Sequence, residues 1–328
     1  MRAWVLEESP GSYSWGEVPD PEVGPDDARV RPVASALNHM DLWVTRGLPK
    51  PHLPHVPGCD VAGVVESVGS SVTHVAVGDE VVLNPAVSSL EAIVAHGNDS
   101  PLDPGFQILG EQRWGGHGDL VVVPGRNVVA KPPERSWEAC AAYPLATLTA
   151  WRMLRRARVR AGESVLVVGI GGGVSTAALA LATRLGAVVY ATSRDRAKQQ
   201  RAVELGAAAA FGSDEDWPVK VDVVVESVGP ATWDRSVRAL KPGGRLAVCG
   251  GTSGPKVELN LPRLFFKQIE IIGSTMGSYE EFAQVTELVG QGLPVHVDDV
   301  LDLADYPKAL ERLRDGAQLG KIVLRHPA

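Results

Sequence analysis

The middle of the chain contains the feature that most restricts its fold, a regular alternation of strand-like and helix-like segments. Strand patterns at residues 164–169 and 188–192 are each followed by a helical pattern, at residues 174–185 and 195–205. The alternation continues through residues 222–226, 232–240 and 245–249. Stretches such as VLVV and DVVV are apolar at every position, as expected for strands buried on both faces of a sheet. The pattern therefore predicts a parallel sheet covered by helices.

A glycine-rich turn joins the first of these strands to its helix and reads GIGGGV over residues 169–174. Glycines permit a tight turn and let backbone N–H groups approach a pyrophosphate at the positive end of the helix. Because strand and helix are both in place, the motif predicts a dinucleotide site of the Rossmann type. The predicted cofactor contacts are Gly169, Gly171, Gly172, Gly173 and Val174. The alternative is a turn without a ligand.

The end of the second strand indicates which nicotinamide cofactor the site prefers. Folds that prefer NAD usually place Asp or Glu there, where it binds the ribose 2′-hydroxyl. Here the strand ends in Thr192, Ser193 and Arg194, and Lys198 follows one turn later. Two hydroxyls and two cations suit the 2′-phosphate of NADP(H). The alternative is a set of ordinary solvated charges at a helix start, with Asp195 as the first-turn acid.

The first third of the chain has a different pattern. Val-rich runs at residues 29–37, 61–68, 80–83 and 120–123 are separated by Gly and Pro, which predicts short strands in a compact barrel or sandwich. After residues 269–273, which form a short apolar strand, amphipathic helices are expected at 279–291 and 306–314. A last strand is expected at 321–325.

Composition limits the class of protein. A length of 328 residues favours two domains. The net charge of −7 argues against a nucleic-acid or anionic-membrane surface. The three cysteines have no paired spacing, so neither disulfides nor a zinc knuckle is indicated. No apolar run is long enough to span a bilayer, and the N-terminal segment does not have the pattern of a signal peptide. A cytoplasmic enzyme is expected.

Six segments spread over nearly the whole chain form a specific pattern. They are residues 36–41 (ALNHMD), 57–65 (PGCDVAGVV), 144–151 (PLATLTAW), the glycine turn, 240–245 (LKPGGR) and 320–324 (GKIVL). Together they resemble the medium-chain dehydrogenase/reductase family, which includes zinc alcohol dehydrogenases and zinc-free quinone oxidoreductases.

This resemblance implies an α/β fold in two domains. A doubly wound Rossmann sheet over residues 148–275 would bind NADP(H), and a GroES-like β-barrel catalytic domain would be built from residues 1–147 and 276–328. The resemblance also implies an active-site cleft between them. It further implies a homodimer or homotetramer in which the strand at 269–273 joins two Rossmann sheets.

The zinc sites of the family are not retained in this sequence. The catalytic ligands Cys, His and Cys of zinc members match Asn38, Cys59 and Leu145 here, which cannot form a tetrahedral site. The four cysteines of the structural zinc lobe match Ser89, Ala92, Ala95 and Asp103. We therefore expect no bound metal. A different site built from His39, His55, Cys59 and Asp60 is the alternative.

The remaining polar residues suggest how a metal-free site would work. Asn38 is the first candidate for a substrate contact, because its amide can donate to a developing oxyanion. Met40 stands at the family's proton-relay position and cannot relay a proton, which argues against simple alcohol oxidation. By family position, Thr149 is expected beside the nicotinamide and His39 near the pyrophosphate, and Lys321 joins the cofactor-binding residues.

Asp41 and Cys59 are further catalytic candidates with a structural alternative each. Asp41, like Asp60, matches an acid that supports the metal ligands of zinc enzymes, and here it would organise hydrogen bonds. Cys59 would otherwise be a small buried residue that fills the vacated metal pocket.

These features predict a zinc-independent, NADP(H)-dependent oxidoreductase that transfers hydride to a quinone, enone or other small carbonyl substrate. A zinc-type alcohol or aldehyde dehydrogenase of the same fold is one alternative. A non-enzymatic NADPH-binding redox sensor is another. No nucleic-acid or membrane partner is expected.

Overall fold

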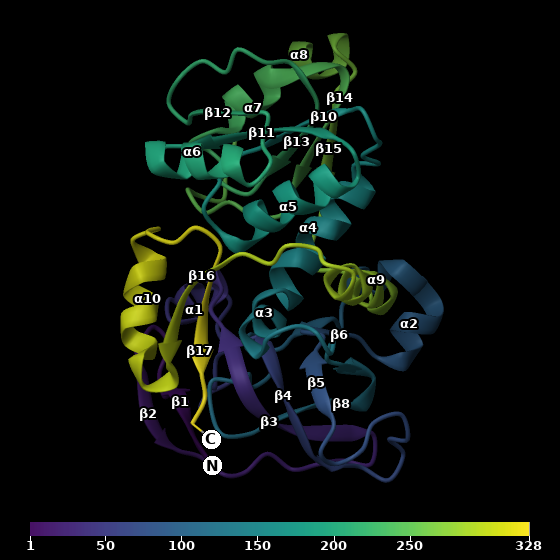
Figure 1. Cartoon of the computed structure of the whole chain (residues 1–328), viewed down its shortest axis with the longest axis vertical. Coiled ribbons are helices and arrows are strands. Elements are labelled where there is room, and N and C mark those ends of the chain that lie inside the picture. Colours follow the sequence, from purple (N-terminus) through teal and green to yellow (C-terminus); the bar gives the residue numbers. More distant parts are fainter. Residues whose placement is uncertain (328) are drawn as a thin grey trace. The chain divides into compact units, whose positions relative to one another are not determined.

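The computed structural model describes residues 1–327 and divides the chain into two compact units (Figure 1). Residues 1–146, together with the segment from Gly277 onward, form the first unit. Residues 147–276 form the second. Each unit has its own sheets and is described by itself.

The second unit is built on a six-stranded, entirely parallel sheet. Its strand order is β12-β11-β10-β13-β14-β15, which is the doubly wound order of a Rossmann fold. The strands are β10 (Ser164–Val167), β11 (Val188–Ser193), β12 (Ala209–Gly212), β13 (Val221–Glu226), β14 (Leu240–Val248) and β15 (Glu270–Gly273). Val165, Leu166 and Val167 are fully buried, as their apolar pattern predicts.

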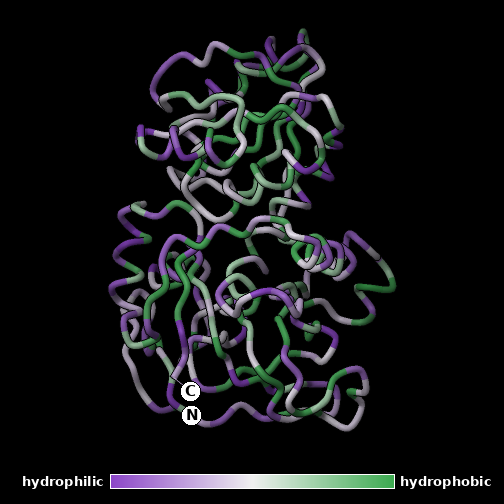
Figure 2. The backbone as a smooth tube through the Cα atoms, viewed as in Figure 1, coloured by the Kyte–Doolittle hydropathy of each residue, from purple (hydrophilic) through white to green (hydrophobic). Residues whose placement is uncertain are grey.

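Helix α4 (Pro144–Arg156) precedes the first strand of this sheet, and a helix lies between most successive strands. These helices are α5 (Gly173–Arg184), α6 (Arg196–Glu204), α7 (Trp233–Ala239) and α8 (Leu261–Phe266). Helix α4 begins at Pro144, because proline is well suited to the first turn of a helix. Figure 2 shows apolar positions gathered in the strands and polar positions in the surrounding loops and helices.

The first unit contains a seven-stranded, mainly antiparallel sheet with the order β16-β17-β3-β4-β5-β9, and β8 pairs with β3. Its strands are β3 (Asp27–Ala36), β4 (Asp60–Val68), β5 (Glu80–Leu83), β8 (Val121–Pro124), β9 (Val128–Ala130), β16 (Val297–Asp302) and β17 (Lys321–Arg325). Two further pairs join β1 (Arg2–Leu6) to β2 (Tyr13–Glu17) and β6 (Ala86–Val87) to β7 (Gln107–Ile108). The last strand of the chain thus pairs with a strand near its beginning.

Short helices surround this sheet. They are α1 (His39–Val44), α2 (Leu90–His96), α3 (Trp137–Ala142), α9 (Tyr279–Gly290) and α10 (Tyr306–Arg314), with 3₁₀ turns η1 (Gly97–Leu102), η2 (Gly125–Asn127) and η3 (Leu303–Asp305). Inside, a core that includes Val30, Val61, Val81 and Val123 is fully buried. Among residues 1–327, no helix is long and apolar enough to cross a membrane. The expected α/β class, a Rossmann sheet with a GroES-like β domain, is confirmed.

Candidate functional site

The glycine turn of the second unit is held in place by the neighbouring strand. The Gly169 N–H donates to Thr192 Oγ1 at 3.0 Å, and the Ile170 N–H donates to the Thr192 carbonyl at 2.7 Å. Gly169 has a φ of +71°, and a Cβ there would lie 2.7 Å from a Val228 methyl carbon, so only glycine fits. Helix α5 follows, with Gly172 as its N-cap. The turn therefore presents a fixed helix N-terminus, which suits a pyrophosphate.

Ser175 strengthens the same turn. Its hydroxyl accepts from the Gly171 N–H at 3.2 Å and donates to the Gly172 carbonyl at 2.9 Å. This serine therefore adds bonds inside the turn.

The tip of β11 corrects one expected cofactor contact. Thr192 is fully buried, and its hydroxyl accepts from the Gly169 N–H, so the side chain supports the turn and does not face a ribose phosphate. Ser193 is also buried, and its hydroxyl accepts from the Asp195 N–H at 3.1 Å. Arg194 is exposed and Lys198 is half-buried in the first turn of α6. A contact of Arg194 and Lys198 with a 2′-phosphate stays a prediction.

Asp195 occupies the N-cap of α6. Its carboxylate accepts from the Ala197 N–H at 2.8 Å and from the Lys198 N–H at 3.4 Å. Asp195, the acid next to the predicted phosphate contacts, thus has a local structural role as a helix cap.

Thr149 lies on α4 and is buried in the second unit. Its hydroxyl is 4.0 Å from the Met276 sulfur, which is a weak contact. Its expected place beside a nicotinamide stays a prediction.

A cluster centred on an ammonium group occupies the first unit. Lys321 Nζ, on β17, donates to the Leu37 carbonyl at 2.6 Å, to Asn38 Oδ1 at 2.7 Å and to Asp60 Oδ2 at 2.7 Å. The three bonds use all three N–H groups of the lysine. Gly320 makes this approach possible, because it has a φ of +114° and a Cβ there would lie 2.3 Å from the His296 carbonyl oxygen.

The amide of Asn38 is bonded within the cluster. Its Nδ2 donates to Cys59 Sγ at 3.0 Å and to Asp60 Oδ2 at 2.8 Å. Both amide hydrogens are therefore used inside the protein, and donation to a substrate oxyanion would require one of these bonds to break. Asn38 organises the cluster in this structure.

The sequence predicts that Lys321 contacts the cofactor. In the structure its charge is compensated within the first unit by Asp60, and its side chain is buried. Its role in this structure is to hold Asn38 and Asp60 together. Its role in cofactor binding stays a prediction.

The donor set of this cluster does not fit zinc. Burial raises the pKa of the Cys59 thiol well above its ordinary value, and Asn38 Nδ2 already donates to its sulfur. Asp60 Oδ1 accepts from the Leu145 N–H at 2.7 Å, and Oδ2 is bound to Lys321. A divalent cation would have to displace the ammonium. Within residues 1–327, no group of three or more His, Cys, Asp and Glu side chains is arranged to hold a metal.

The other positions that match zinc ligands of the family, or belong to the alternative metal site, have separate contacts. Buried His55 contacts the Gly110 carbonyl through Nε2 at 3.0 Å. In the region that corresponds to the structural zinc lobe, Ser89 caps α2 by accepting from the Ala92 N–H, and Asp103 Oδ2 lies 3.7 Å from His96 Nε2.

Helix α1 brings two more titratable groups to the cluster. Asp41 is fully buried, and its Oδ2 accepts from the Asn38 N–H at 2.7 Å. Burial raises the pKa of Asp41 to about 7, although Lys321 opposes this. His39 is half-buried, and burial lowers the pKa of its imidazole. Met40, between them in the sequence, is buried, and a methionine side chain has no hydroxyl group.

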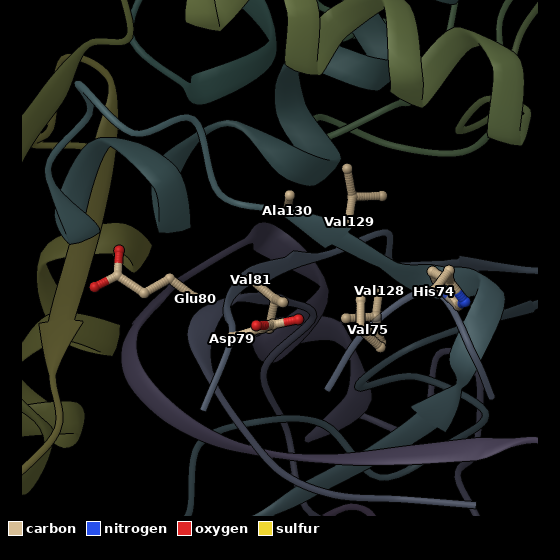
Figure 3. Close-up of a pocket in the computed structure, with 8 residues that line it drawn as sticks. All are labelled: His74, Val75, Asp79, Glu80, Val81, Val128, Val129 and Ala130. Carbon is tan, nitrogen blue, oxygen red and sulfur yellow. The ribbon is translucent and has the colours of Figure 1, made fainter. Parts of the chain in front are cut away.

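A separate hollow of about 470 Å³ lies over β5 and β9 (Figure 3). Valines and an alanine from these strands line it, with His74, Asp79 and Glu80 at its polar parts. None of the residues of the lysine-centred cluster or the glycine turn contributes to it.

Both halves of the chain match known families. Residues 24–133 match the alcohol dehydrogenase GroES-like domain, and residues 173–291 match the zinc-binding dehydrogenase family.

Three curated relatives align over most of the chain. The crotonyl-CoA reductase of Streptomyces avermitilis is 30% identical, over 93% of this chain and 80% of the relative. A zinc-type alcohol dehydrogenase-like protein of Schizosaccharomyces pombe is 32% identical, over 94% and 93%. The acryloyl-coenzyme A reductase of Metallosphaera sedula is 29% identical, over 99% of each chain.

Solved structures show the same likeness. An NAD-dependent alcohol dehydrogenase is 39% identical with a TM-score of 0.93 over 99% of each chain. The cobalt- and zinc-bound alcohol dehydrogenase of Pyrobaculum aerophilum is 34% identical, with a TM-score of 0.92 over 99% of each chain. The 2-octenoyl-CoA carboxylase reductase CinF, in complex with NADP and 2-octenoyl-CoA, is 26% identical with a TM-score of 0.92, over 99% of this chain and 87% of CinF. The chain therefore belongs to the medium-chain dehydrogenase/reductase family, among its zinc-type alcohol dehydrogenase-like members.

Proposed function

We propose that this protein is a zinc-independent, NADP(H)-dependent reductase of a carbon–carbon double bond conjugated to a carbonyl group. The observation that carries the proposal is the Lys321 ammonium, bonded to Leu37, Asn38 and Asp60 in a cluster that includes the positions matching two of the family's metal ligands. With Asp60 already paired to this ammonium, the donor set favours a metal-free reaction.

The chemistry of conjugated substrates suits such a site. A bound nicotinamide would supply the hydride. The β-carbon of an enone, quinone or 2-enoyl thioester is already electron-poor and accepts hydride without a metal. An alcohol must instead lose its hydroxyl proton as hydride leaves, and buried Met40 stands at the position from which the family relays that proton. Relatives named as reductases of crotonyl-CoA and acryloyl-coenzyme A support the same substrate class.

The choice of NADP(H) depends on the tip of β11. Exposed Arg194 and half-buried Lys198 offer two cations beside the helix start, and no carboxylate ends the strand. CinF, whose solved structure contains NADP, supports this choice, whereas the related alcohol dehydrogenase is named as NAD-dependent.

Arg194→Ala tests the cofactor directly. A charge-assisted contact with phosphate contributes roughly 1.5–3 kcal/mol, so NADPH binding should weaken about ten- to a hundredfold while NADH binding hardly changes. Fluorescence titration measures both affinities. Arg196→Ala, a neighbouring exposed arginine on α6, is the matched control. Equal weakening of NADPH and NADH binding by Arg194→Ala would remove the basis of the NADP assignment.

A substrate panel tests the reaction. The purified protein is assayed with NADPH and crotonyl-CoA, an α,β-unsaturated ketone or a quinone, and with NADP⁺ and alcohols, before and after treatment with a chelator. We expect turnover of at least one conjugated acceptor, no loss on chelation, and far less than one zinc per chain by metal analysis. Near-stoichiometric zinc together with alcohol-dependent NADP⁺ reduction would favour the second candidate, an alcohol dehydrogenase. The likeness to alcohol dehydrogenases at 34–39% identity is the observation that supports that candidate.

A further inference from the structure

A line of polar side chains leads away from Asp41 through the first unit. Ser35, at the end of β3, is fully buried, and its Oγ lies 2.9 Å from His117 Nδ1 and 2.8 Å from His326 Nε2. The other nitrogen of His117, Nε2, lies 3.9 Å from Asp41 Oδ1. His326 is half-buried just after β17. The line therefore connects a fully buried carboxyl group with a partly exposed imidazole.

The hydrogen bonds fix the direction of this line. The His326 ring also bonds to the backbone of Gly118, and only a carbonyl can accept from it, so that ring nitrogen carries hydrogen. Burial lowers the pKa of His326 to about 4, so the ring is neutral and Nε2 accepts from the Ser35 hydroxyl. Since Ser35 has one proton, His117 Nδ1 must donate to it.

This direction determines the state of Asp41. Burial holds the pKa of His117 well below its ordinary value, so a ring with hydrogen on Nδ1 carries a lone pair on Nε2. That lone pair faces Asp41 Oδ1, about 1 Å beyond hydrogen-bond distance. Neither atom has another hydrogen-bond partner among residues 1–327. A proton on Asp41 Oδ1 would face this lone pair and would bond to it after an approach of about 1 Å, whereas a carboxylate would repel the ring nitrogen.

We propose that Ser35, His117 and His326 hold Asp41 in its protonated form and exchange that proton with solvent at His326. On release, Asp41 Oδ1 gives its proton to His117 Nε2, His117 Nδ1 gives its proton to Ser35, and Ser35 gives its own to His326 Nε2. His326 then breaks its bond to Gly118 and releases the proton on that nitrogen to water. One proton leaves, one carboxylate forms, and both rings end neutral.

The consequence is a change of charge next to Asn38. Lys321 and Asp60 compensate each other, so the cluster is neutral while Asp41 is protonated and gains one negative charge when it ionises. Titratable groups facing Asp41 from the surrounding elements are Lys321, Asp60, Cys59, Tyr13, Tyr306 and His117. His117 is thus a positioning residue that sets the charge of the cluster. This inference goes beyond the proposed reaction and does not depend on its substrate.

Nitrogen-15 NMR of wild-type protein labelled at histidine shows which ring nitrogens of His117 and His326 carry hydrogen, and so tests the direction of the hydrogen bonds. His117→Gln and His326→Gln serve only to assign two of the eight histidines. We expect both rings to be neutral from pH 5 to 8, with hydrogen on Nδ1 at pH 5 and on Nε2 at pH 8, where Asp41 has ionised. An Nε2–H ring at His117 at pH 5 in the wild type, or an Nδ1–H ring at pH 8, would overturn the proposal.

Infrared spectroscopy of the Asp41 carboxyl group, with Asp41→Asn as the subtraction, tests the coupling. The wild type should keep the protonated carboxyl band until about pH 7. Ser35→Ala removes the acceptor for His117 Nδ1, so the ring can turn its hydrogen toward Asp41 and the apparent pKa should fall by about one unit, a tenfold change. His326→Gln keeps an acceptor for Ser35 and should leave the titration near that of the wild type. An unchanged titration in Ser35→Ala, or Asp41 ionised at pH 5 in the wild type, would contradict the proposal.

Discussion

At the scale of single residues, the sequence indicates which residues form the site but not the hydrogen bonds that join them. Asn38, Asp41 and Cys59 were selected because they match family positions, and the structure brings the three together. Lys321 as the centre of the cluster was missed, because it lies 261 residues after Asp60 and no local pattern links the two. The only available signal was the Gly-Lys pair at residues 320 and 321, which the resemblance had assigned to the cofactor.

The raised pKa of Asp41 has a measurable effect on stability. Its value in the folded protein is about 7, above the ordinary value for an aspartate, so the unfolded chain loses this proton first as the pH rises. The stability that the protonated form contributes is complete at low pH and is lost between about pH 4 and pH 7. Asp41→Asn should therefore flatten the pH dependence in this window and be at least as stable as the wild type at pH 8.

Urea unfolding at pH 5 and pH 8 measures this effect. Asp27→Asn, a change of an acid on β3 outside the cluster, is the control and should keep the slope of the wild type. If Asp41→Asn were destabilised relative to the wild type more at pH 8 than at pH 5, the buried Asp41 of the wild type would be ionised.

At the scale of elements, the contact between β11 and the glycine turn leads to a second prediction. Thr192→Val removes the acceptor of the Gly169 N–H, which costs about 1 kcal/mol for a typical hydrogen bond. Because the turn serves the part of the cofactor common to both nucleotides, NADPH and NADH should weaken equally, by about fivefold. Fluorescence titration of both cofactors measures the ratio. Thr192→Ser, which keeps the hydroxyl, is the control. If Thr192→Val weakened NADPH binding and not NADH binding, Thr192 would contact the 2′-phosphate, contrary to what its burial indicates.

Sequence patterns predict the bounds of several helices and strands well. The apolar strands at β10, β11 and β13 and their helices were predicted within a few residues, because strands buried on both faces have a strong and local signature. The role of Thr192 was not predictable in the same way. Residues 192 and 169 meet only through strand pairing, and a threonine at a strand tip has the same local pattern whether its hydroxyl faces a ligand or a neighbouring turn.

At the scale of the whole molecule, strand β15 lies at the edge of the six-stranded sheet, as the sequence predicts. The Ser274 N–H bonds to Val248, so by alternation the Ile271 N–H points to the open side. Edges of this kind are commonly paired or covered. We propose a homodimer joined through two β15 strands, and light scattering should give twice the 34.8 kDa of one chain.

Ile271→Pro tests this arrangement because it removes a donor on the open side while leaving the bonds to β14. It should shift the mass toward one chain at micromolar concentration, and Ile271→Val should not. A monomeric wild type, or a dimer unaffected by the proline, would exclude pairing through this strand.

The pairing of β17 with β3 has a consequence for how the protein is made. Residues 147–276 form a unit with a continuous stretch of chain, so this unit can fold while synthesis is still under way. The first 146 residues must wait, because β3 pairs with β17 and the partner of Asp60 is Lys321. A chain that ends near residue 300 would hold the complete Rossmann unit, and Asp60 would lack its cation. The Rossmann unit can thus form before the lysine-centred cluster does.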